Sequence, residues 1–254
     1  MIRAVRNLTF FCLLLTASAC TERTTVPSQV RQLPITSTAS TQVFTGTLAP
    51  AGSQTFAFTI GSAPVRVSLG SLTDADGTPL SQSLRLTFGI PQGTGCGPIQ
   101  AATTRTGLST QLQVNVSGGT YCVSVEDIGQ LSSTATFGVR IILGDPSTRG
   151  GGGTVTYAQT VLPKGSTTRT FEASLRGDVT ILFDAIEPSS VASLGIGVGF
   201  PRSDGGGCVL NLTATATRGS QFTFPVEAGT YCIQVSDPGT LTGPAQFSLR
   251  IQHP

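Results

Sequence analysis

A ten-residue segment that occurs twice constrains the fold of this chain more than any other feature. It reads Gly-Gly-Thr-Tyr-Cys-Val-Ser-Val-Glu-Asp at 118–127 and Ala-Gly-Thr-Tyr-Cys-Ile-Gln-Val-Ser-Asp at 228–237. In both copies an aromatic and two β-branched residues alternate with a cysteine and polar residues, which is the period of a strand with one buried face. We therefore expect a central strand of a β-sandwich in each copy, with Tyr121 and Tyr231 facing the core.

The similarity between the two copies extends beyond this segment. Residues 44–53, Phe-Thr-Gly-Thr-Leu-Ala-Pro-Ala-Gly-Ser, correspond to Tyr-Ala-Gln-Thr-Val-Leu-Pro-Lys-Gly-Ser at 157–166. Residues 137–141, Phe-Gly-Val-Arg-Ile, correspond to Phe-Ser-Leu-Arg-Ile at 247–251. Matches at the beginning, middle and end of two stretches of similar length indicate an internal duplication.

Short runs with strand periodicity fill both copies, and turn residues rich in glycine, proline and aspartate separate them. In the first copy we expect strands at 41–48, 54–60, 65–72, 84–90, 111–116, 120–126 and 135–143. This pattern predicts an all-β protein with two tandem antiparallel β-sandwich domains, jelly-roll or immunoglobulin-like, of about seven to eight strands each. The expected boundaries are 41–144 for repeat 1, 145–153 for a Gly-rich linker and 154–254 for repeat 2.

Residues 1–19 have the features of an export signal. Arg3 and Arg6 precede an apolar run at 8–15, which is too short for a permanent membrane span, and small residues follow it. Two processing routes fit this leader. Cleavage after Ala17-Ser18-Ala19 would release a soluble protein, whereas the same stretch followed by Cys20 resembles the bacterial lipoprotein signal, with Ala17 where leucine is usual.

The number of cysteines favours lipidation. Of the six cysteines, Cys12 leaves with the leader and four form pairs that recur in both copies, so that Cys20 is left over. An unpaired thiol in an exported protein needs a reason, and acylation provides one. We therefore expect a membrane anchor on Cys20, a polar tether at 20–40, and a cell-envelope location, at the outer membrane if the host is Gram-negative.

Each copy contains a second cysteine upstream of its repeated strand. Cys96 lies 26 residues before Cys122, and Cys208 lies 24 residues before Cys232. In an exported chain the simplest interpretation is two bridges, Cys96–Cys122 and Cys208–Cys232. The strand period predicts that Cys122 faces away from the core, so that its bridge pins a Gly-rich loop across the outside or edge of the sheet. A zinc site is disfavoured because the cysteines of each copy are far apart and the one histidine, His253, lies next to the end of the sequence.

These segments together resemble the bacterial pre-peptidase C-terminal domains. The resemblance rests on four stretches: 44–58, Leu-Arg-Leu-Thr-Phe at 84–88, Gly-Thr-Tyr-Cys-Val-Ser-Val at 119–125, and 136–141. Such domains are β-sandwich modules of secreted proteases and other cell-surface proteins, so the resemblance implies a sandwich fold and an accessory role. Many members carry aspartates before the strand that corresponds to 84–88, where this chain has Ser-Gln-Ser at 81–83.

The sequence shows no arrangement of residues typical of catalysis. A single histidine near the end of the sequence is a poor base for Ser-His-Asp or Cys-His chemistry. The acidic residues are sparse and fall mostly in turns, and we expect no catalytic, cofactor-binding or metal site. Asp74-Ala-Asp76-Gly77 is partly like a calcium loop, but its later ligands are missing and a plain Asp-Gly turn is preferred. Without Arg3 and Arg6 the net charge of +2 falls to zero, which gives no electrostatic basis for nucleic-acid binding.

Two polar positions recur in both copies. Asp127 and Asp237 follow the repeated strand, and we expect them to cap turns. Arg140 and Arg250 lie on the polar face of the last strand, where exposed cross-strand charge pairs are expected.

The sequence thus predicts a non-catalytic cell-envelope lipoprotein with a binding or structural role, whose ligand could be a protein or a polysaccharide. A secreted accessory module for a separate extracellular enzyme, such as a protease, is the alternative. An enzyme with an unfamiliar site is the third hypothesis.

Overall fold

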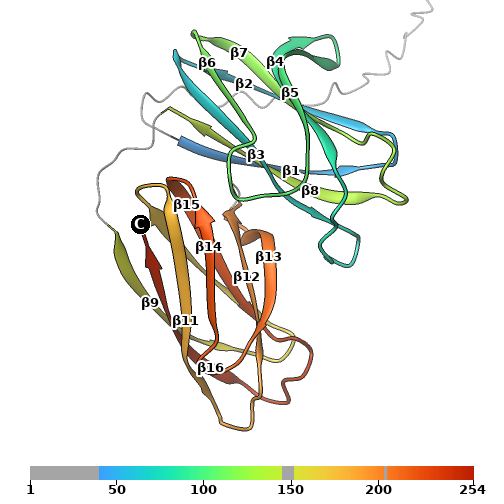
Figure 1. Cartoon of the computed structure of the whole chain (residues 1–254). Helices are drawn as coiled ribbons and strands as arrows, with labels where there is room; N and C mark the ends of the chain where they lie inside the picture. The colour runs from blue at the N-terminus through green and yellow to red at the C-terminus, as the bar shows by residue number, and fades with distance from the viewer. Residues whose placement is uncertain (1–39, 145–151, 203–204) are drawn as a thin grey trace, which may run out of the picture.

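The computed structural model describes residues 40–144, 152–202 and 205–254, and all regular structure within them is β-strand (Figure 1). The predicted signal peptide, Cys20, nearly all of the tether and most of the Gly-rich linker lie outside the described residues. The described strands form four sheets of four strands each, arranged as two β-sandwiches. The all-β fold class with two tandem sandwich domains is therefore correct.

The first sandwich contains β1 to β8, and the second contains β9 to β16. The strands of the first are β1 (Ser40–Leu48), β2 (Ser53–Ile60), β3 (Ala63–Thr73), β4 (Leu84–Gln92), β5 (Gly95–Thr104), β6 (Leu112–Val116), β7 (Gly119–Glu126) and β8 (Ala135–Leu143). Those of the second are β9 (Gly153–Val161), β10 (Ser166–Ala173), β11 (Gly177–Glu187), β12 (Leu194–Pro201), β13 (Cys208–Ala216), β14 (Gln221–Val226), β15 (Gly229–Ser236) and β16 (Ala245–His253).

Strand order is the same in both sandwiches. In the first, one sheet has the order β1-β8-β3-β6 and the other β2-β7-β4-β5; in the second, the orders are β9-β16-β11-β14 and β10-β15-β12-β13. All the pairings are antiparallel. Eight strands in two four-stranded sheets with this order form a jelly roll, and the identical topology of the two sandwiches agrees with an internal duplication.

One strand of the first sandwich was not expected from the sequence. β5 (Gly95–Thr104) contains Cys96, although the glycines around this cysteine suggested a loop. The glycines instead allow a close approach of two strands: Gly89 on β4 lies so near Gly97 on β5 that a Cβ at residue 89 would overlap the Gly97 carbonyl oxygen. The ladder between β4 and β5 also shifts register between Phe88 and Gly89, which is a β-bulge that bends the hairpin.

The core of each sandwich lies between its two sheets, where the inward side chains of alternating positions meet. Tyr121 and Tyr231 face these cores, as predicted from the strand period. Their hydroxyl groups donate hydrogen bonds of 2.8 Å to the carbonyl oxygens of Ser117 and Glu227, so that each buried phenol keeps a polar partner. The two tyrosines therefore serve the fold in both copies.

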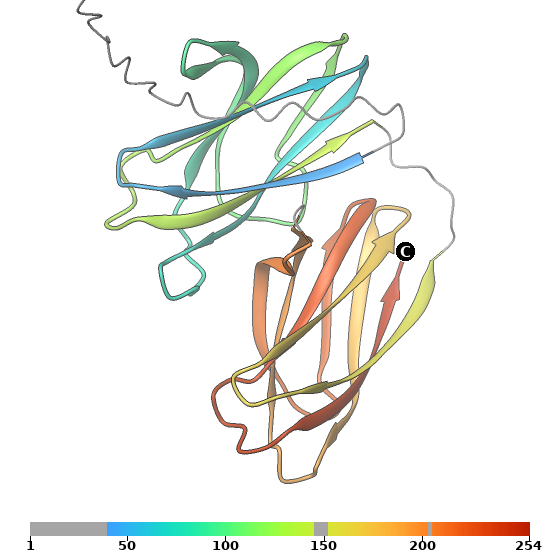
Figure 2. The same ribbon diagram turned by 180° about the vertical axis from the view of Figure 1, so that it is seen from behind.

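The two sandwiches meet end to side. In Figures 1 and 2 the end of the second sandwich that carries the β12–β13 hairpin lies against the β1-β8-β3-β6 sheet of the first. Contacts of β12 and β13 with β3 make up part of this meeting. The second sandwich therefore contacts the β1-β8-β3-β6 sheet of the first. Within the described residues, the corresponding sheet of the second sandwich, β9-β16-β11-β14, has no such contact.

Candidate functional site

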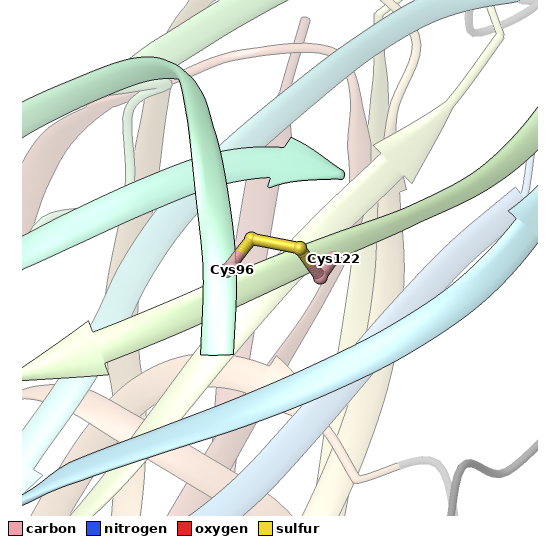
Figure 3. The surroundings of a disulfide bond; sticks show 2 residues. All are labelled: Cys96 and Cys122. Atoms are coloured by element: carbon pink, nitrogen blue, oxygen red, sulfur yellow. A yellow bond between two sulfur atoms is a disulfide. The ribbon is translucent and has the colours of Figure 1, made fainter. Parts of the chain in front are cut away.

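The structure contains both predicted disulfides. Cys96 is bonded to Cys122, and Cys208 to Cys232, with Cα–Cα distances of 5.8 and 5.9 Å. Figure 3 shows the first bridge, at the point where the strand that carries Cys96 passes across the strand that carries Cys122. Disulfides of this kind persist in oxidising compartments, which indicates an exported protein.

The strand cysteines are more buried than the sequence suggested. Cys122 alternates with Tyr121 and Val123, which pack in the core, so its sulfur points to the outer face of the sheet, as predicted. It is nevertheless fully buried, because the bent β4–β5 hairpin folds over that face, and Cys232 is buried in the same way in the second copy. The bridge thus holds a strand, and not a loop, against the outside of the sheet.

Asp127 ties two turns together in the first sandwich. Its Oδ1 accepts hydrogen bonds from the backbone N–H groups of Gln130 (2.8 Å) and Leu131 (3.2 Å), and its Oδ2 accepts one from Ala51 (2.8 Å) in the β1–β2 turn. Burial of Asp127 opposes its ionisation, but the backbone donors, of which Ala51 is the strongest, hold the pKa of this carboxyl below its ordinary value. The turn-capping prediction is correct, and the link to Ala51 is an additional finding.

Asp237 has the same role in the second sandwich. Its Oδ2 accepts a 2.7 Å hydrogen bond from the backbone N–H of Lys164, and its Oδ1 accepts bonds from Gly239, Thr240 and Leu241. The bond from Lys164 is the largest cause of the lowered pKa of Asp237. Ala51 and Lys164 both have positive φ, 55° and 59°, so in each copy the aspartate binds a turn residue in the left-handed conformation.

Arg250 forms the exposed cross-strand ion pair that the sequence predicted. Its Nε and Nη2 donate hydrogen bonds of 2.8 to 3.1 Å to the carboxylate of Asp184 on β11. Asp184 occupies the extra position of a β-bulge, between Phe183 and Ala185. These hydrogen bonds and the charge of Asp184 raise the pKa of Arg250.

Arg140, at the corresponding position of the first sandwich, contradicts the same prediction. It is fully buried beneath the second sandwich. It has no acidic partner among the described residues, because Gly70 occupies the bulge position that Asp184 occupies in the second copy. Its guanidinium carbon lies 4.1 Å from the ring centroid of Phe200 and 4.9 Å from that of Tyr231, both in the second sandwich. The prediction failed because strand period identifies a polar face but not a domain that covers it.

Further contacts surround Arg140 at the junction, which we define as Gly70, Arg140, Phe200, Asn211 and Tyr231. The Arg140 Nη2 donates a 3.1 Å hydrogen bond to the carbonyl of Leu108, and the Asn211 amide donates one of 2.6 Å to the carbonyl of Gly70. A Cβ on Gly70 would overlap the ring of Phe200. The missing side chain at residue 70 therefore lets Phe200 reach Arg140.

The junction joins parts of the duplicated fold that are not equivalent. Phe200 is fully buried, whereas Ile90, at the corresponding position of the first copy, is 52% exposed. The end of the second sandwich is thus used for docking, and the same end of the first is not. Two differences between the copies could have revealed this from the sequence. Gly70 corresponds to Asp184, and Ile90 corresponds to Phe200.

A second feature distinguishes the second sandwich, namely an apolar pocket of about 300 Å³ between β13 and β14, which we call the slot. The slot is lined by Ile196, Val198, Leu212, Thr213, Ala214, Gln221, Phe222, Thr223 and Phe224. It has the size of a small ligand site, and its lining is apolar apart from Thr213, Gln221 and Thr223. Sequence analysis did not predict it.

The copies differ at one of the residues that line the slot. Phe88 pairs with Val123 across the first sheet, and Val198 pairs with Ile233 at the corresponding place in the second. The ring of Phe88 is fully buried and stacks on Tyr121, with ring centroids 5.4 Å apart. The second copy has the smaller, aliphatic Val198 at this position.

The segment with alternating aspartates, 74–77, forms a turn. Asp74 Oδ1 accepts hydrogen bonds from the backbone N–H groups of Asp76 (3.0 Å) and Thr78 (2.8 Å), and Gly77 has a φ of 83°. Within the described residues no three His, Cys, Asp or Glu side chains gather as metal ligands would. The described part of the chain also contains no helix that is long and apolar enough to cross a membrane.

No protein-family model matches the chain, and no curated protein matches it in sequence. Among solved structures, a Paenibacillus xanthan lyase has a TM-score of 0.25 and 11% identity over 85% of this chain, which spans 25% of the lyase chain. A protein of the Sulfolobus turreted icosahedral virus has a TM-score of 0.24 and 13% identity over 85% of this chain and 92% of its own. The CUB1-EGF-CUB2 domains of rat MASP-1 have a TM-score of 0.25 and 10% identity over 87% of this chain and 98% of their own. Likenesses at this level carry no argument about the function of this chain.

Proposed function

We propose that this chain is a non-catalytic, lipid-anchored protein of the cell envelope, in which two jelly-roll domains act as one rigid structural or binding unit. The observation that carries the proposal is the junction at Arg140, where a buried guanidinium lies against two rings of the other sandwich. Two domains with a fixed relative orientation suit a protein that binds a ligand on a surface made by both, or that holds two structures a fixed distance apart.

Two further observations support the location. The disulfides of both sandwiches suit an oxidising compartment. Residues 1–19 have the features of an export signal, and Cys20 follows them directly. On this proposal the acylated cysteine anchors the protein, and the twenty residues 21–40, which can extend about 65 Å, hold the sandwiches away from the bilayer.

The N-terminal processing tests the anchor directly. The protein is expressed in a bacterial host with and without globomycin, and the N-terminal peptide is analysed by mass spectrometry. The proposal predicts a diacylglyceryl mass on Cys20, recovery in the membrane fraction, and accumulation of the precursor with globomycin. A Cys20→Ser variant should appear in the soluble fraction with its sandwiches intact.

The alternative outcome is equally clear. Cleavage after Ala19 with an unmodified Cys20 and a soluble product would contradict lipid anchoring. That result would favour the secreted accessory module, whose partner enzyme would then be sought in the culture medium.

A further inference from the structure

The slot lies at the open corner of the second sandwich, between two strands that each have a free edge. β13 is the last strand of the sheet β10-β15-β12-β13, and β14 is the last of the sheet β9-β16-β11-β14. Within the described residues neither strand pairs with a further strand on its outer side. Backbone N–H and C=O groups of such an edge are free to pair with an added strand.

The slot suits an uncharged, apolar occupant. None of its lining side chains is charged, and three of them, Ile196, Val198 and Phe224, are buried apolar residues. Leu212 on β13 is 44% exposed, which leaves a large apolar side chain at the mouth. A side chain on a strand added beside β13 would point into this space at every second position.

The first sandwich differs from the second at the equivalent corner. A fully buried phenylalanine, Phe88, stands at the position that corresponds to Val198 of the slot. Its edge strand β5 also contains Pro98, which faces Gly89 as Leu210 faces Gly199 in the second copy. Proline on an edge strand blocks the addition of another strand, because it has no N–H to donate, whereas β13 contains neither proline nor charge.

The slot is also continuous with the junction between the sandwiches. β13 contacts the first sandwich near its start, where Asn211 donates its hydrogen bond to Gly70 and Val209 lies against Gly138. The next residues of the same strand, 212 to 214, line the slot. A chain that runs along β13 would therefore extend a contact surface that the protein already uses.

From these observations we propose that the slot binds an extended, uncharged peptide segment, which adds to the edge of β13 and places an apolar side chain between β13 and β14. A polypeptide fits better than an acyl chain because only a polypeptide can satisfy the free N–H and C=O groups of the strand edge. This inference deepens the proposed binding role and is independent of Cys20, so its failure and a failure of lipid anchoring are separate results.

The test is a selection of phage-displayed 12-residue peptides on the full chain, followed by affinity measurements on synthetic versions of the enriched peptides. We expect enriched sequences that alternate apolar with polar uncharged residues. We expect Val198→Phe, which restores the ring of the first copy, and Leu212→Lys, which places a charge at the mouth, each to weaken binding at least tenfold. The matched control is Gln100→Lys, at the corresponding exposed position on β5, which should leave the dissociation constant unchanged within twofold. In hydrogen-exchange measurements, the backbone amides of β13 should exchange more slowly in the peptide complex than in the free protein.

Three results would each overturn the proposal. The selection could enrich no sequence, or the peptides could bind Val198→Phe and Leu212→Lys as tightly as the wild type although both variants have native circular dichroism. The bound peptide could also protect amides elsewhere than in β13. Dodecanoate as a second probe covers the acyl alternative: binding of dodecanoate that Val198→Phe abolishes, without peptide binding, would assign the slot to a fatty acyl chain instead. A dimer in analytical ultracentrifugation that Leu212→Lys dissociates would assign it to a second copy of this chain.

Discussion

The substitution Gly70→Asp would place in the first sandwich the residue that the second has at the same bulge position. Asp184 shows that the bulge accepts an aspartate and that this aspartate binds the arginine of the neighbouring strand. An aspartate at residue 70 would overlap the ring of Phe200 and offer Arg140 a carboxylate instead. We therefore expect the variant to keep both sandwiches folded and to lose the contact between them.

The magnitude follows from the contacts that would be lost. Desolvated contacts of a guanidinium with aromatic rings contribute up to about 2 kcal/mol each, and Arg140 makes two, with Phe200 and Tyr231. The hydrogen bond from Asn211 to the Gly70 carbonyl contributes about 1 kcal/mol. The docking equilibrium should thus lose at most about 5 kcal/mol, between three and four powers of ten, and less by the cost of burying the Arg140 Nε and Nη1 without hydrogen-bond partners in the docked state.

The assay is solution NMR together with small-angle X-ray scattering. In the wild type the side-chain protons of Arg140 lie over two rings, so ring currents should shift their resonances upfield, and the shift should vanish in Gly70→Asp. The maximum dimension from scattering should increase. The reverse substitution at the equivalent position, Asp184→Gly, removes the exposed ion pair with Arg250 and should leave docking unchanged. Unaltered Arg140 shifts and scattering in Gly70→Asp would refute the reasoning.

Three further predictions concern the individual sandwiches. Replacing Cys96 and Cys122 together by serine should lower the free energy of unfolding of the first sandwich by about 3.5 kcal/mol, because the bridge closes a loop of 26 residues in the unfolded chain. Urea denaturation measures this change, and a decrease of under about 1 kcal/mol would contradict the prediction. Asp127→Asn should destabilise by about 1–3 kcal/mol at pH 7. Because folding lowers the pKa of Asp127, its contribution is present above about pH 4 and is lost as the pH falls through the folded pKa, so wild type and variant should converge in acid and a constant difference down to pH 2 would be inconsistent. Gly89→Ala should destabilise by about 2–3 kcal/mol because its Cβ meets the backbone of β5. Gly95→Ala on the same hairpin should change the melting temperature little, because its Cβ would meet only the Gln92 carbonyl oxygen, at an ordinary contact distance of 3.7 Å.

The sequence was informative wherever a local pattern determines the structure. The repeated strands could be predicted because Tyr121 and Val123 alternate with polar positions, and a sheet with one buried face imposes that period. The disulfides could be predicted because the same cysteine pairs recur in both copies of a chain whose first residues have the features of an export signal. Asp127 could be predicted as a cap because it follows a strand and precedes a glycine turn, although its bond to Ala51 joins segments 76 residues apart.

The remaining features depend on contacts between distant segments. β5 was missed because its glycines are typical of a loop, and its place in the sheet depends on a hairpin that bends at Gly89. The burial of Arg140 results from a second domain that covers a polar sheet face, and the slot forms where residues of three strands, β12, β13 and β14, come together. Strand period contains neither kind of information. A position-by-position comparison of the copies contains part of it, since Gly70 corresponds to Asp184 in the two bulges.

The central claim is that the two sandwiches form one rigid unit through the junction at Arg140. Residual dipolar couplings of the backbone N–H groups in a weakly aligned sample test this most directly. The account predicts that a single alignment tensor fits the couplings of both sandwiches, with the relative orientation seen in Figures 1 and 2. Two tensors of different magnitude, one for residues 40–144 and one for residues 152–254, would show independent motion and contradict it.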